Sequence, residues 1–274
     1  MSYTVYIIYS KSLNKYYTGS CENLTIRLSQ HNAGRNKSTK AGIPWIIKHI
    51  EYYNTFTEAR SREAAIKKMK SRIYIESLIN SANSFDANFW SDKYQNNSTQ
   101  WDLGLVSPPI KQYIDQLTNK DCRILIPGCG NAYEAAYLLE QGFTNITLID
   151  IAEPLVQSLQ KKYKNDSRIQ IILGDFFNHQ GQYDLIIEQT FFCAIDPSLR
   201  TNYVIKMSQL IAKGGKLVGL LFNRSFEGGP PFGGNKEEYI HLFSPTFSIK
   251  KLETCYNSFK KREESELFMI FIIK

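Results

Sequence analysis

The chain has 274 residues, of which 43% are hydrophobic, and its formal net charge is +7. This apolar fraction excludes a wholly disordered chain, and no apolar run reaches the ~18 residues of a membrane span, so we expect no membrane partner. Residues 1–80 hold 13 Lys or Arg and 5 Asp or Glu, a net charge of +8, whereas residues 81–274 hold 20 and 21, a net charge of −1. This division predicts an anionic partner for residues 1–80, unless the basic surface only keeps the protein soluble.

The N-terminus and the cysteines predict a cytoplasmic protein. The first ten residues lack the basic region and the small-residue cleavage site of a signal peptide. The five cysteines are an odd number and show no CxxC spacing. We therefore expect free thiols in a reducing compartment, with neither disulfides nor a zinc site.

Residues 1–80 predict a small α+β domain with the element order ββαβαα. β-branched and aromatic runs mark the strands, and the spacing of apolar residues marks the helices. The expected strands are residues 3–9, 16–20 and 45–53, and the expected helices are residues 24–31, a segment starting at Thr57, and 74–79. A small, polar linker is expected over residues 81–88.

Residues 89–274 predict an α/β domain, because strands and amphipathic helices alternate along the chain. Such alternation is typical of a parallel, doubly wound sheet covered by helices on both faces. The expected strands are residues 123–127, 146–151, 169–173, 184–188 and 216–222, and the expected helices are 133–141, 153–163 and 199–212.

Five polar side chains of the first domain form a candidate site. A hairpin of the first two strands would bring the phenols of Tyr6 and Tyr17 together, and Arg27 lies one helical turn from His31. Glu63 lies on a later, basic helix. Taken singly, the tyrosines are explained by packing, and Glu63 by an i,i+4 pair with a lysine.

As a set, the strings VYIIYS, KYYTGS, LTIRLSQHNAG and FTEARSREAAIKKMKSR resemble the GIY-YIG nuclease family over residues 3–80. The resemblance implies that Tyr6, Tyr17, Arg27 and His31 are catalytic. It also implies that Glu63 binds a divalent metal, Mg or Mn, and it favours DNA as the nucleic acid.

The sequence departs from the family motifs at three positions. Val5 replaces the motif glycine, Thr18 replaces the isoleucine, and Ser20 stands where some members carry a lysine. The guanidinium fork of Arg27 can bind the scissile phosphate, and a metal held by the Glu63 carboxylate can stabilise the charge on the leaving oxygen. A phenol, whose pKa is normally near ~10, needs help from the metal, the arginine or the histidine to act as a base.

The second domain carries three features of a nucleoside cofactor site. Gly128 and Gly130 form a turn between a strand and a helix, and Asp150 follows 20 residues later at the end of the next strand, where a carboxylate can bind ribose hydroxyls. Asp175 and Phe176 follow the third strand. Because the turn lacks the third glycine that a pyrophosphate requires, S-adenosylmethionine is favoured over a dinucleotide.

The strings FWSDKYQNNSTQWDLG, ILIPGCG, LIDIAEPLVQ, GDFF and GGPPF resemble the thiopurine S-methyltransferase family over residues 89–274, in particular its halide and thiol branch. The resemblance implies a Rossmann-like sheet and a small-molecule methyl acceptor. It implies cofactor contacts from the aromatic arm, the glycine turn, the ribose and adenine positions and the end of the fourth strand, namely Trp90, Tyr94, Trp101, Gly128, Gly130, Asp150, Asp175, Phe176 and Gln189.

Two departures bear on the substrate: Tyr94 replaces a tryptophan, and Gln189 stands where the branch often has a tyrosine. The prediction is a methyltransferase for a small thiol, thiocyanate or halide, fused to a nuclease-like domain. One alternative is an N-terminal domain that only binds nucleic acid. Another is an enzyme in which both domains act on nucleic acid. The alternative in which both domains act on nucleic acid is disfavoured. The sequence Ser107-Pro108-Pro109 is similar to the catalytic loop of base methylases, but it precedes the glycine turn, whereas that loop follows a later strand.

Overall fold

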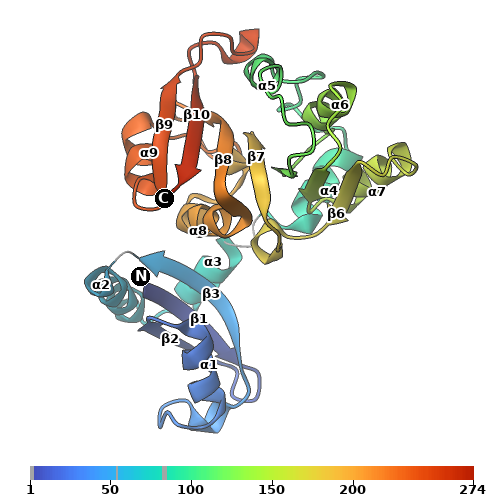
Figure 1. Cartoon of the computed structure of the whole chain (residues 1–274). Helices are drawn as coiled ribbons and strands as arrows, with labels where there is room; N and C mark the ends of the chain where they lie inside the picture. The colour runs from blue at the N-terminus through green and yellow to red at the C-terminus, as the bar shows by residue number, and fades with distance from the viewer. Residues whose placement is uncertain (1–2, 54, 82–84) are drawn as a thin grey trace. The chain divides into compact units, whose positions relative to one another are not determined.

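The computed structural model describes residues 3–53, 55–81 and 85–274. The chain divides into two compact units, residues 1–84 and 85–274 (Figure 1). Within the described residues, no helix is both long and apolar enough to cross a membrane. The five cysteines are free thiols, and the cytoplasmic location stays a prediction.

The N-terminal unit is built on a three-stranded antiparallel sheet with the strand order β2-β1-β3. The predicted order ββαβαα is confirmed. The elements are β1 (Tyr3–Ser10), β2 (Lys15–Cys21), α1 (Leu24–Asn32), η1 (Lys40–Gly42), β3 (Trp45–Tyr53), α2 (Phe56–Lys68) and α3 (Arg72–Ser81).

The central strand β1 separates two small apolar clusters. Val5 packs with Ala59 and Ile66 of α2, whereas Tyr6 packs in a second cluster with Trp45 of β3. Because neighbouring residues of a strand point to opposite faces, α1 and α2 cover different faces of the sheet. Tyr6 pairs with Gly19 across the β1–β2 register, which places the first motif tyrosine beside the second motif.

One predicted boundary in this region is wrong. Helix α2 begins after Thr55, not at Thr57, because Thr55 and Glu58 form a capping box. The Thr55 Oγ1 accepts from the Glu58 backbone N–H at 3.2 Å, and the Glu58 Oε2 accepts from the Thr55 N–H at 3.1 Å. The linker expected over 81–88 is helical at both ends, since α3 reaches Ser81 and the next helix begins at Ala87, while residues 82–84 lie outside the described residues.

The C-terminal unit contains a seven-stranded sheet with the strand order β6-β5-β4-β7-β8-β10-β9. Five strands are parallel, and β10 runs antiparallel to both of its neighbours. The strands are β4 (Ile124–Pro127), β5 (Ile146–Asp150), β6 (Ile169–Leu173), β7 (Tyr183–Gln189), β8 (Ile211–Phe222), β9 (Phe247–Thr254) and β10 (Glu266–Ile273).

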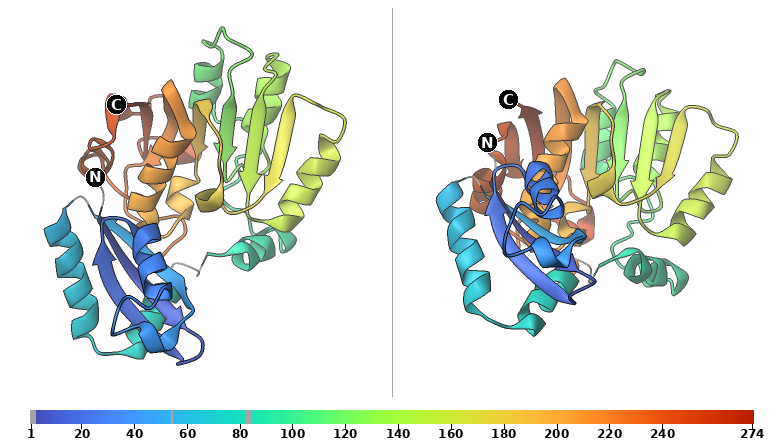
Figure 2. Two further views of the ribbon diagram at one scale, coloured as in Figure 1. Left: turned by 60° about the horizontal axis from the view of Figure 1, so that its bottom comes forward. Right: turned by 90° about the horizontal axis from the view of Figure 1, so that it is seen from below.

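Helices cover both faces of this sheet (Figure 2), which confirms the predicted fold class. Helices α8 and α9 pack on one apolar cluster, and α5, α6 and α7 pack on the other. The helices are α4 (Ala87–Gln95), α5 (Pro108–Ile114), α6 (Tyr133–Glu140), α7 (Glu153–Lys162), α8 (Arg200–Leu210) and α9 (Lys236–Phe243).

Strand alternation explains why the core has two halves. Leu125 and Ile186 belong to the α8–α9 side, whereas their neighbours Ile124, Ile126 and Ile187 belong to the α5–α7 side. The strand order reverses at β4, and ligands of such sheets bind outside the carboxyl ends of the strands at this point.

The α8–β8 connection differs from the prediction. The helix expected over 199–212 ends at Leu210, and β8 begins at Ile211 instead of residue 216. Tyr183 pairs with Ile211 but Leu185 pairs with Lys216, so the segment between them bulges out of the ladder. Gly214, with φ +81°, allows this bulge.

Candidate functional sites

The turn after β4 has three residues in the left-handed region: Gly128 (φ +55°), Gly130 (φ +51°) and Ala132 (φ +56°). The Gly128 N–H donates to the Ile149 carbonyl at 2.8 Å, which ties the turn to β5. A Cβ on Gly128 would lie 2.3 Å from the Phe191 ring. Glycine is therefore required here by the backbone conformation and by the close approach of an aromatic ring.

Asp150 ends β5 directly beside this turn, as the sequence predicts. One carboxylate oxygen accepts from the Ala152 N–H at 3.0 Å, and the other accepts from the Gly130 N–H at 3.4 Å. Burial raises the pKa of Asp150 to about 6, although these backbone donors act in the opposite direction. The two predicted features, the glycine turn and the acidic strand end, therefore lie side by side.

The aromatic arm over residues 85–107 packs against the same site. The ring centroids of Trp90 and Trp101 are 5.5 Å apart, and those of Tyr94 and Trp101 are 5.9 Å apart. The Tyr94 hydroxyl lies 3.5 Å from the position that a Cβ on Gly130 would take. Burial and the charge of Asp150 raise the pKa of Tyr94, so its hydroxyl stays protonated beside the carboxylate.

The adenine-side candidates have different surroundings. Asp175 is half-buried, and its carboxylate accepts from the Phe177 N–H at 2.8 Å and from the Asn178 side chain at 3.1 Å. Phe176 is buried in the core, with its ring centroid 5.0 Å from that of Phe191. Phe191 in turn lies against Gly128, so the Phe191 ring stands between Phe176 and the glycine turn.

Gln189 is half-buried at the carboxyl end of β7, level with the glycine turn. Its side-chain oxygen accepts from the Thr190 hydroxyl at 2.9 Å. Thr190 has φ +62°, which turns the chain sharply at the strand end. The turn directs the following residue, Phe191, onto Gly128.

In the N-terminal unit, Tyr6, Arg27 and His31 form one hydrogen-bonded cluster. The Tyr6 hydroxyl oxygen lies 2.8 Å from His31 Nε2 and accepts from Arg27 Nε–H at 3.2 Å. The Tyr17 ring centroid lies 5.2 Å from that of His31. Burial raises the pKa of Tyr6 to about 12, although Arg27 opposes this shift. Burial and the charge of Arg27 lower the pKa of His31, so this imidazole is neutral near pH 7.

Glu63 on α2 lies at a separate point of this site, beside β2. Its carboxylate accepts from the Ser20 hydroxyl and from Lys67 Nζ, both at 2.5 Å, and Arg60 lies 3.4 Å away. Burial alone would raise the pKa of Glu63, but the hydrogen bonds from Lys67 and Ser20 outweigh it and lower the pKa. Lys67 Nζ also lies 5.6 Å from the Tyr17 ring centroid, so it joins Glu63 to the tyrosine pair.

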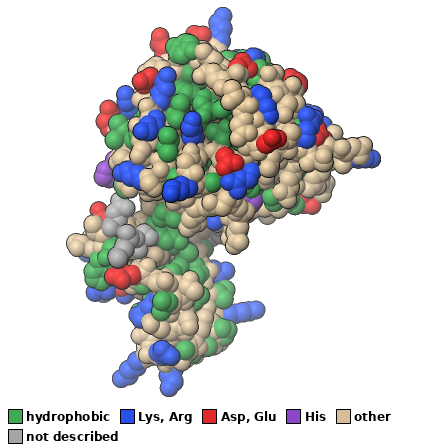
Figure 3. Space-filling model, viewed as in Figure 1, with side chains coloured by type: hydrophobic (Ala, Val, Ile, Leu, Met, Phe, Trp, Pro, Cys, Tyr) green, Lys and Arg blue, Asp and Glu red, His purple; other side chains and the backbone are tan. Residues whose placement is uncertain are grey.

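The donor set around Glu63 fits a single hard divalent cation. A carboxylate and a hydroxyl are oxygen ligands, and Mg²⁺ binds through one or two carboxylates together with water and substrate phosphate. The Lys67 ammonium neutralises the Glu63 carboxylate, which is the role that such a cation would take. No group of three or more His, Cys, Asp or Glu able to hold a metal occurs among the described residues. On the face drawn in Figure 3, lysine and arginine side chains stand out from the N-terminal unit, with few acidic ones among them.

Comparison with known proteins assigns each unit to a family. Residues 85–271 match the thiopurine S-methyltransferase family, and residues 2–75 match the GIY-YIG catalytic domain. The chain belongs to the thiopurine S-methyltransferase family. It is an S-adenosylmethionine-dependent methyltransferase fused to a GIY-YIG domain, and the predicted fusion is confirmed.

Curated relatives of this family are similar over most of their own length. A probable thiol methyltransferase of Arabidopsis thaliana is 30% identical over 164 residues, which cover 57% of this chain and 71% of the relative. Thiocyanate methyltransferase 1 of Brassica oleracea is 26% identical and covers 65% of this chain and 81% of its own. A Burkholderia thailandensis N1-methyltransferase, solved with S-adenosylhomocysteine, shares the fold with a TM-score of 0.56 at 16% identity, covering 69% of this chain and 87% of its own.

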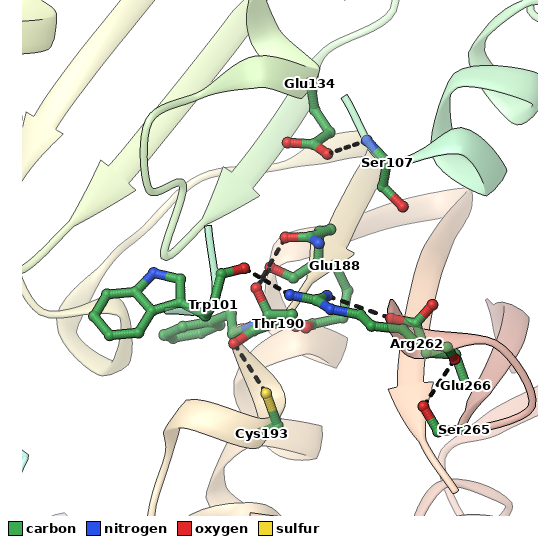
Figure 4. Close-up of polar contacts among 11 residues, drawn as sticks. Trp101, Ser107, Glu134, Glu188, Thr190, Cys193, Arg262, Ser265 and Glu266 are labelled. Carbon is green, nitrogen blue, oxygen red and sulfur yellow. Dashed lines mark hydrogen bonds and ion pairs between the residues drawn. The ribbon is translucent and has the colours of Figure 1, made fainter. Parts of the chain in front are cut away.

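Besides the residues expected for this methyltransferase family, the structure shows a buried polar cluster at the arm (Figure 4). Arg262 donates to the Trp101 carbonyl oxygen at 2.6 Å and to Glu266 at 3.3 Å. Glu134 accepts from the Ser107 N–H at 3.1 Å, so α6 holds the other end of the arm. The sequence gives no signal for Arg262, because it lies about 160 residues from the carbonyl it binds.

Glu188 is a further buried residue that sequence reasoning did not assign. It is fully buried at the end of β7, and it accepts from the Phe191 and Phe192 N–H groups at 2.9 and 3.0 Å. The Tyr203 hydroxyl donates to its second oxygen at 2.7 Å. Burial raises the pKa of Glu188 to about 7. An acidic residue ending the apolar run Leu185–Ile187 was the available sequence signal.

Proposed function

We propose that the C-terminal unit transfers a methyl group from S-adenosylmethionine to a small thiol, thiocyanate or halide. The observation that supports this most strongly is the convergence of Tyr94, Trp101, Gly128 and Asp150 on one end of the sheet. These residues come from three separate segments, the aromatic arm, the glycine turn and the end of β5, and meet at the β4 switch point, where ligands of such sheets bind.

The residues at this point fit the cofactor. Asp150 offers a buried carboxylate for the ribose hydroxyls, and the glycine turn allows the backbone to approach closely. Trp90, Tyr94 and Trp101 would cover the bound nucleoside with aromatic surface. When bound, S-adenosylmethionine supplies a methyl group on a sulfonium, which is already activated for transfer. The protein residues then have to position the acceptor and exclude water.

The surroundings of Glu188 favour a soft acceptor that needs no general base. Its two carboxylate oxygens already accept three hydrogen bonds, from Phe191, Phe192 and Tyr203. These bonds and its full burial hold Glu188 in the β7 turn, so we assign this carboxylate a structural role and not that of a general base. The names of the Arabidopsis and Brassica relatives, a thiol and a thiocyanate methyltransferase, support the same acceptor class.

Transfer of labelled methyl from S-adenosylmethionine to a panel of acceptors tests this proposal. The panel holds iodide, thiocyanate, hydrosulfide, aromatic thiols, DNA and RNA. We expect label on one or more of the sulfur or halide acceptors, and its loss in Asp150→Ala. Asp184→Ala, a half-buried carboxylate paired with Arg123 at the other end of β7, is the control for a lost acidic group. Label confined to nucleic acid would contradict the acceptor class and would unite the two units in one pathway.

We further propose that the N-terminal unit is a metal-dependent nuclease acting on DNA. Arg27 would bind the scissile phosphate through its guanidinium fork, with Tyr6 and His31 holding it in place. Tyr17 would orient the attacking water, and Glu63 would hold Mg²⁺ or Mn²⁺. The metal, when bound, neutralises charge that develops on the phosphate and the leaving oxygen.

Glu63→Ala separates cleavage from binding. We expect Mg²⁺- or Mn²⁺-dependent cleavage of DNA to be lost, while DNA affinity stays within about twofold, because the phosphate-binding cations remain. Glu22→Ala, an exposed acidic residue of the same unit, is the matched control and should cleave normally. Binding without cleavage in the unsubstituted chain would leave the unit as a nucleic-acid-binding module and refute the nuclease proposal.

A further inference from the structure

Thr39 lies behind the Tyr6–Arg27–His31 cluster and is fully buried. Its hydroxyl oxygen lies 2.8 Å from His31 Nδ1, and it can donate to the Asn36 carbonyl at 3.4 Å. The Thr39 backbone is fixed in turn, because Trp45 Nε1–H donates to its carbonyl at 2.7 Å. A chain of four groups thus leads from Thr39 through His31 and Tyr6 to Arg27.

The directions of these hydrogen bonds can be assigned from Arg27. A guanidinium only donates, so the Tyr6 oxygen accepts from Arg27 Nε–H. The Tyr6 side chain is 1% exposed, and His31 Nε2 is the acceptor within reach of its hydroxyl proton in the described structure. A buried donor without a partner is costly, so Tyr6 donates to Nε2. A neutral His31 then carries its proton on Nδ1 and donates to Thr39.

One contact favours the opposite tautomer. The Asn36 side-chain nitrogen lies 3.4 Å from His31 Nδ1 and would donate to that atom if it were unprotonated. The Thr39 oxygen, at 2.8 Å, lies much closer to His31 Nδ1 than the Asn36 nitrogen does. The tautomer that donates to Thr39 also leaves Nε2 free to accept the Tyr6 proton. Thr39 therefore decides between two proton arrangements, and Asn36 would take over if the Thr39 hydroxyl were absent.

We propose that Thr39 is a positioning residue of the nuclease site, whose hydroxyl accepts from the Nδ1–H of His31 and so keeps Nε2 as the acceptor of the Tyr6 proton. In the opposite tautomer, His31 Nε2–H and Arg27 would both donate to the Tyr6 oxygen, and the buried Tyr6 proton would have no acceptor. Thr39 thereby fixes the direction of the hydrogen bond between Tyr6 and His31, at the same oxygen that Arg27 contacts. The cleavage consequence rests on the proposed nuclease function, whereas the tautomer does not.

Nitrogen NMR of histidine-labelled full-length chain tests the tautomer directly. His31→Gln identifies the His31 signals among the four histidines. At neutral pH we expect protonated Nδ1 and unprotonated Nε2 in the unsubstituted chain and in Thr39→Ser, and the reverse in Thr39→Val. Protonated Nε2 in the unsubstituted chain, or an unchanged tautomer in Thr39→Val, would overturn the proposal.

Cleavage kinetics supply the second readout. We expect Thr39→Val to lower kcat roughly tenfold, because the buried Tyr6 hydroxyl loses its acceptor and is no longer held in place, and Thr39→Ser to restore it. Thr4→Val, which removes another buried hydroxyl of this unit, controls for a loss of stability and should cleave normally. Equal losses in Thr39→Val and Thr4→Val would show a merely structural role. A chain that never cleaves would refute the nuclease proposal, and the NMR result would still decide the role of Thr39.

Discussion

At the scale of single residues, two requirements coincide at Gly128. Its φ of +55° belongs to the left-handed region, and the Phe191 ring occupies the space that a Cβ would need. Gly142, at the end of α6, has φ +84° but nothing within 4 Å of its missing Cβ. Comparing substitutions at the two glycines therefore separates the cost of backbone strain from the cost of steric overlap.

We expect Gly128→Ala to lower the free energy of unfolding of the C-terminal unit by about 2–4 kcal/mol, from left-handed strain plus overpacking against Phe191. Gly142→Ala should cost only about 1 kcal/mol, from strain alone. Thermal unfolding measures both. Calorimetric titration with S-adenosylhomocysteine should show weakened binding in Gly128→Ala only. Equal effects of the two substitutions would contradict the role of Phe191.

Glu188 predicts a pH dependence of stability. Burial raises its pKa from 4.5 to about 7, so the folded state binds this proton more tightly than the unfolded chain does. The resulting stabilisation is present below about pH 4.5 and is lost as the pH rises to 7. Relative to the unsubstituted chain, Glu188→Gln should gain roughly 3 kcal/mol in unfolding free energy between pH 4.5 and 7.5. Urea unfolding across this range measures it, and the exposed Glu140→Gln should show no such trend.

At the scale of elements, the aromatic arm is held over the proposed cofactor site by residues from distant parts of the chain. Arg262 of η5 (Lys260–Arg262) binds the Trp101 carbonyl and the buried Glu266, and α6 binds Ser107 through Glu134. Trp90 and Tyr94 of the arm also pack against the apolar cluster on the α5–α7 side, so polar and apolar contacts together hold the arm.

Arg262→Met should destabilise the C-terminal unit by about 3 kcal/mol or more, because Glu266 is left as a buried charge without its cation. The double substitution Arg262→Met with Glu266→Leu should recover much of this stability. The affinity for S-adenosylhomocysteine should nevertheless stay about tenfold lower, since Trp101 has lost its charged donor. Lys260→Met, exposed on the same short helix, is the control. Full recovery of affinity in the double variant would show that Arg262 does not hold the arm.

At the scale of the whole molecule, charge divides between the two units: +8 on residues 1–80 and −1 on residues 81–274. Binding of a polyanion to the first unit releases counterions and depends steeply on salt. Methyl transfer to a small acceptor in the second unit would release no counterions. The two activities should therefore respond differently to ionic strength.

We expect DNA affinity to fall by more than about tenfold between 50 and 200 mM salt, while the rate of methyl transfer to a thiol changes by less than about twofold. Fluorescence anisotropy of labelled DNA and the labelled-methyl assay give the two quantities on the same preparation. A salt-insensitive affinity for DNA would contradict electrostatic binding by the first unit. A methyl transfer rate that follows the DNA-binding curve would indicate a shared nucleic-acid substrate.

The sequence by itself determined the two-family organisation, the fold class and the elements that carry the motifs. Local patterns suffice for these features: strand alternation, helical spacing and a glycine turn followed by Asp150 each lie within a few tens of residues. Boundaries were less certain, as Thr55 and Ile211 show, because a cap or a bulge depends on one or two hydrogen bonds.

Only the tertiary structure decided which side chains complete each site. Phe191 against Gly128, Arg262 on the Trp101 carbonyl and Thr39 behind His31 are contacts between segments that share no local pattern. Such contacts arise where burial leaves a polar group in need of a partner or leaves room for one ring. Their identity depends on the packing of the whole unit, which periodicity and spacing do not encode.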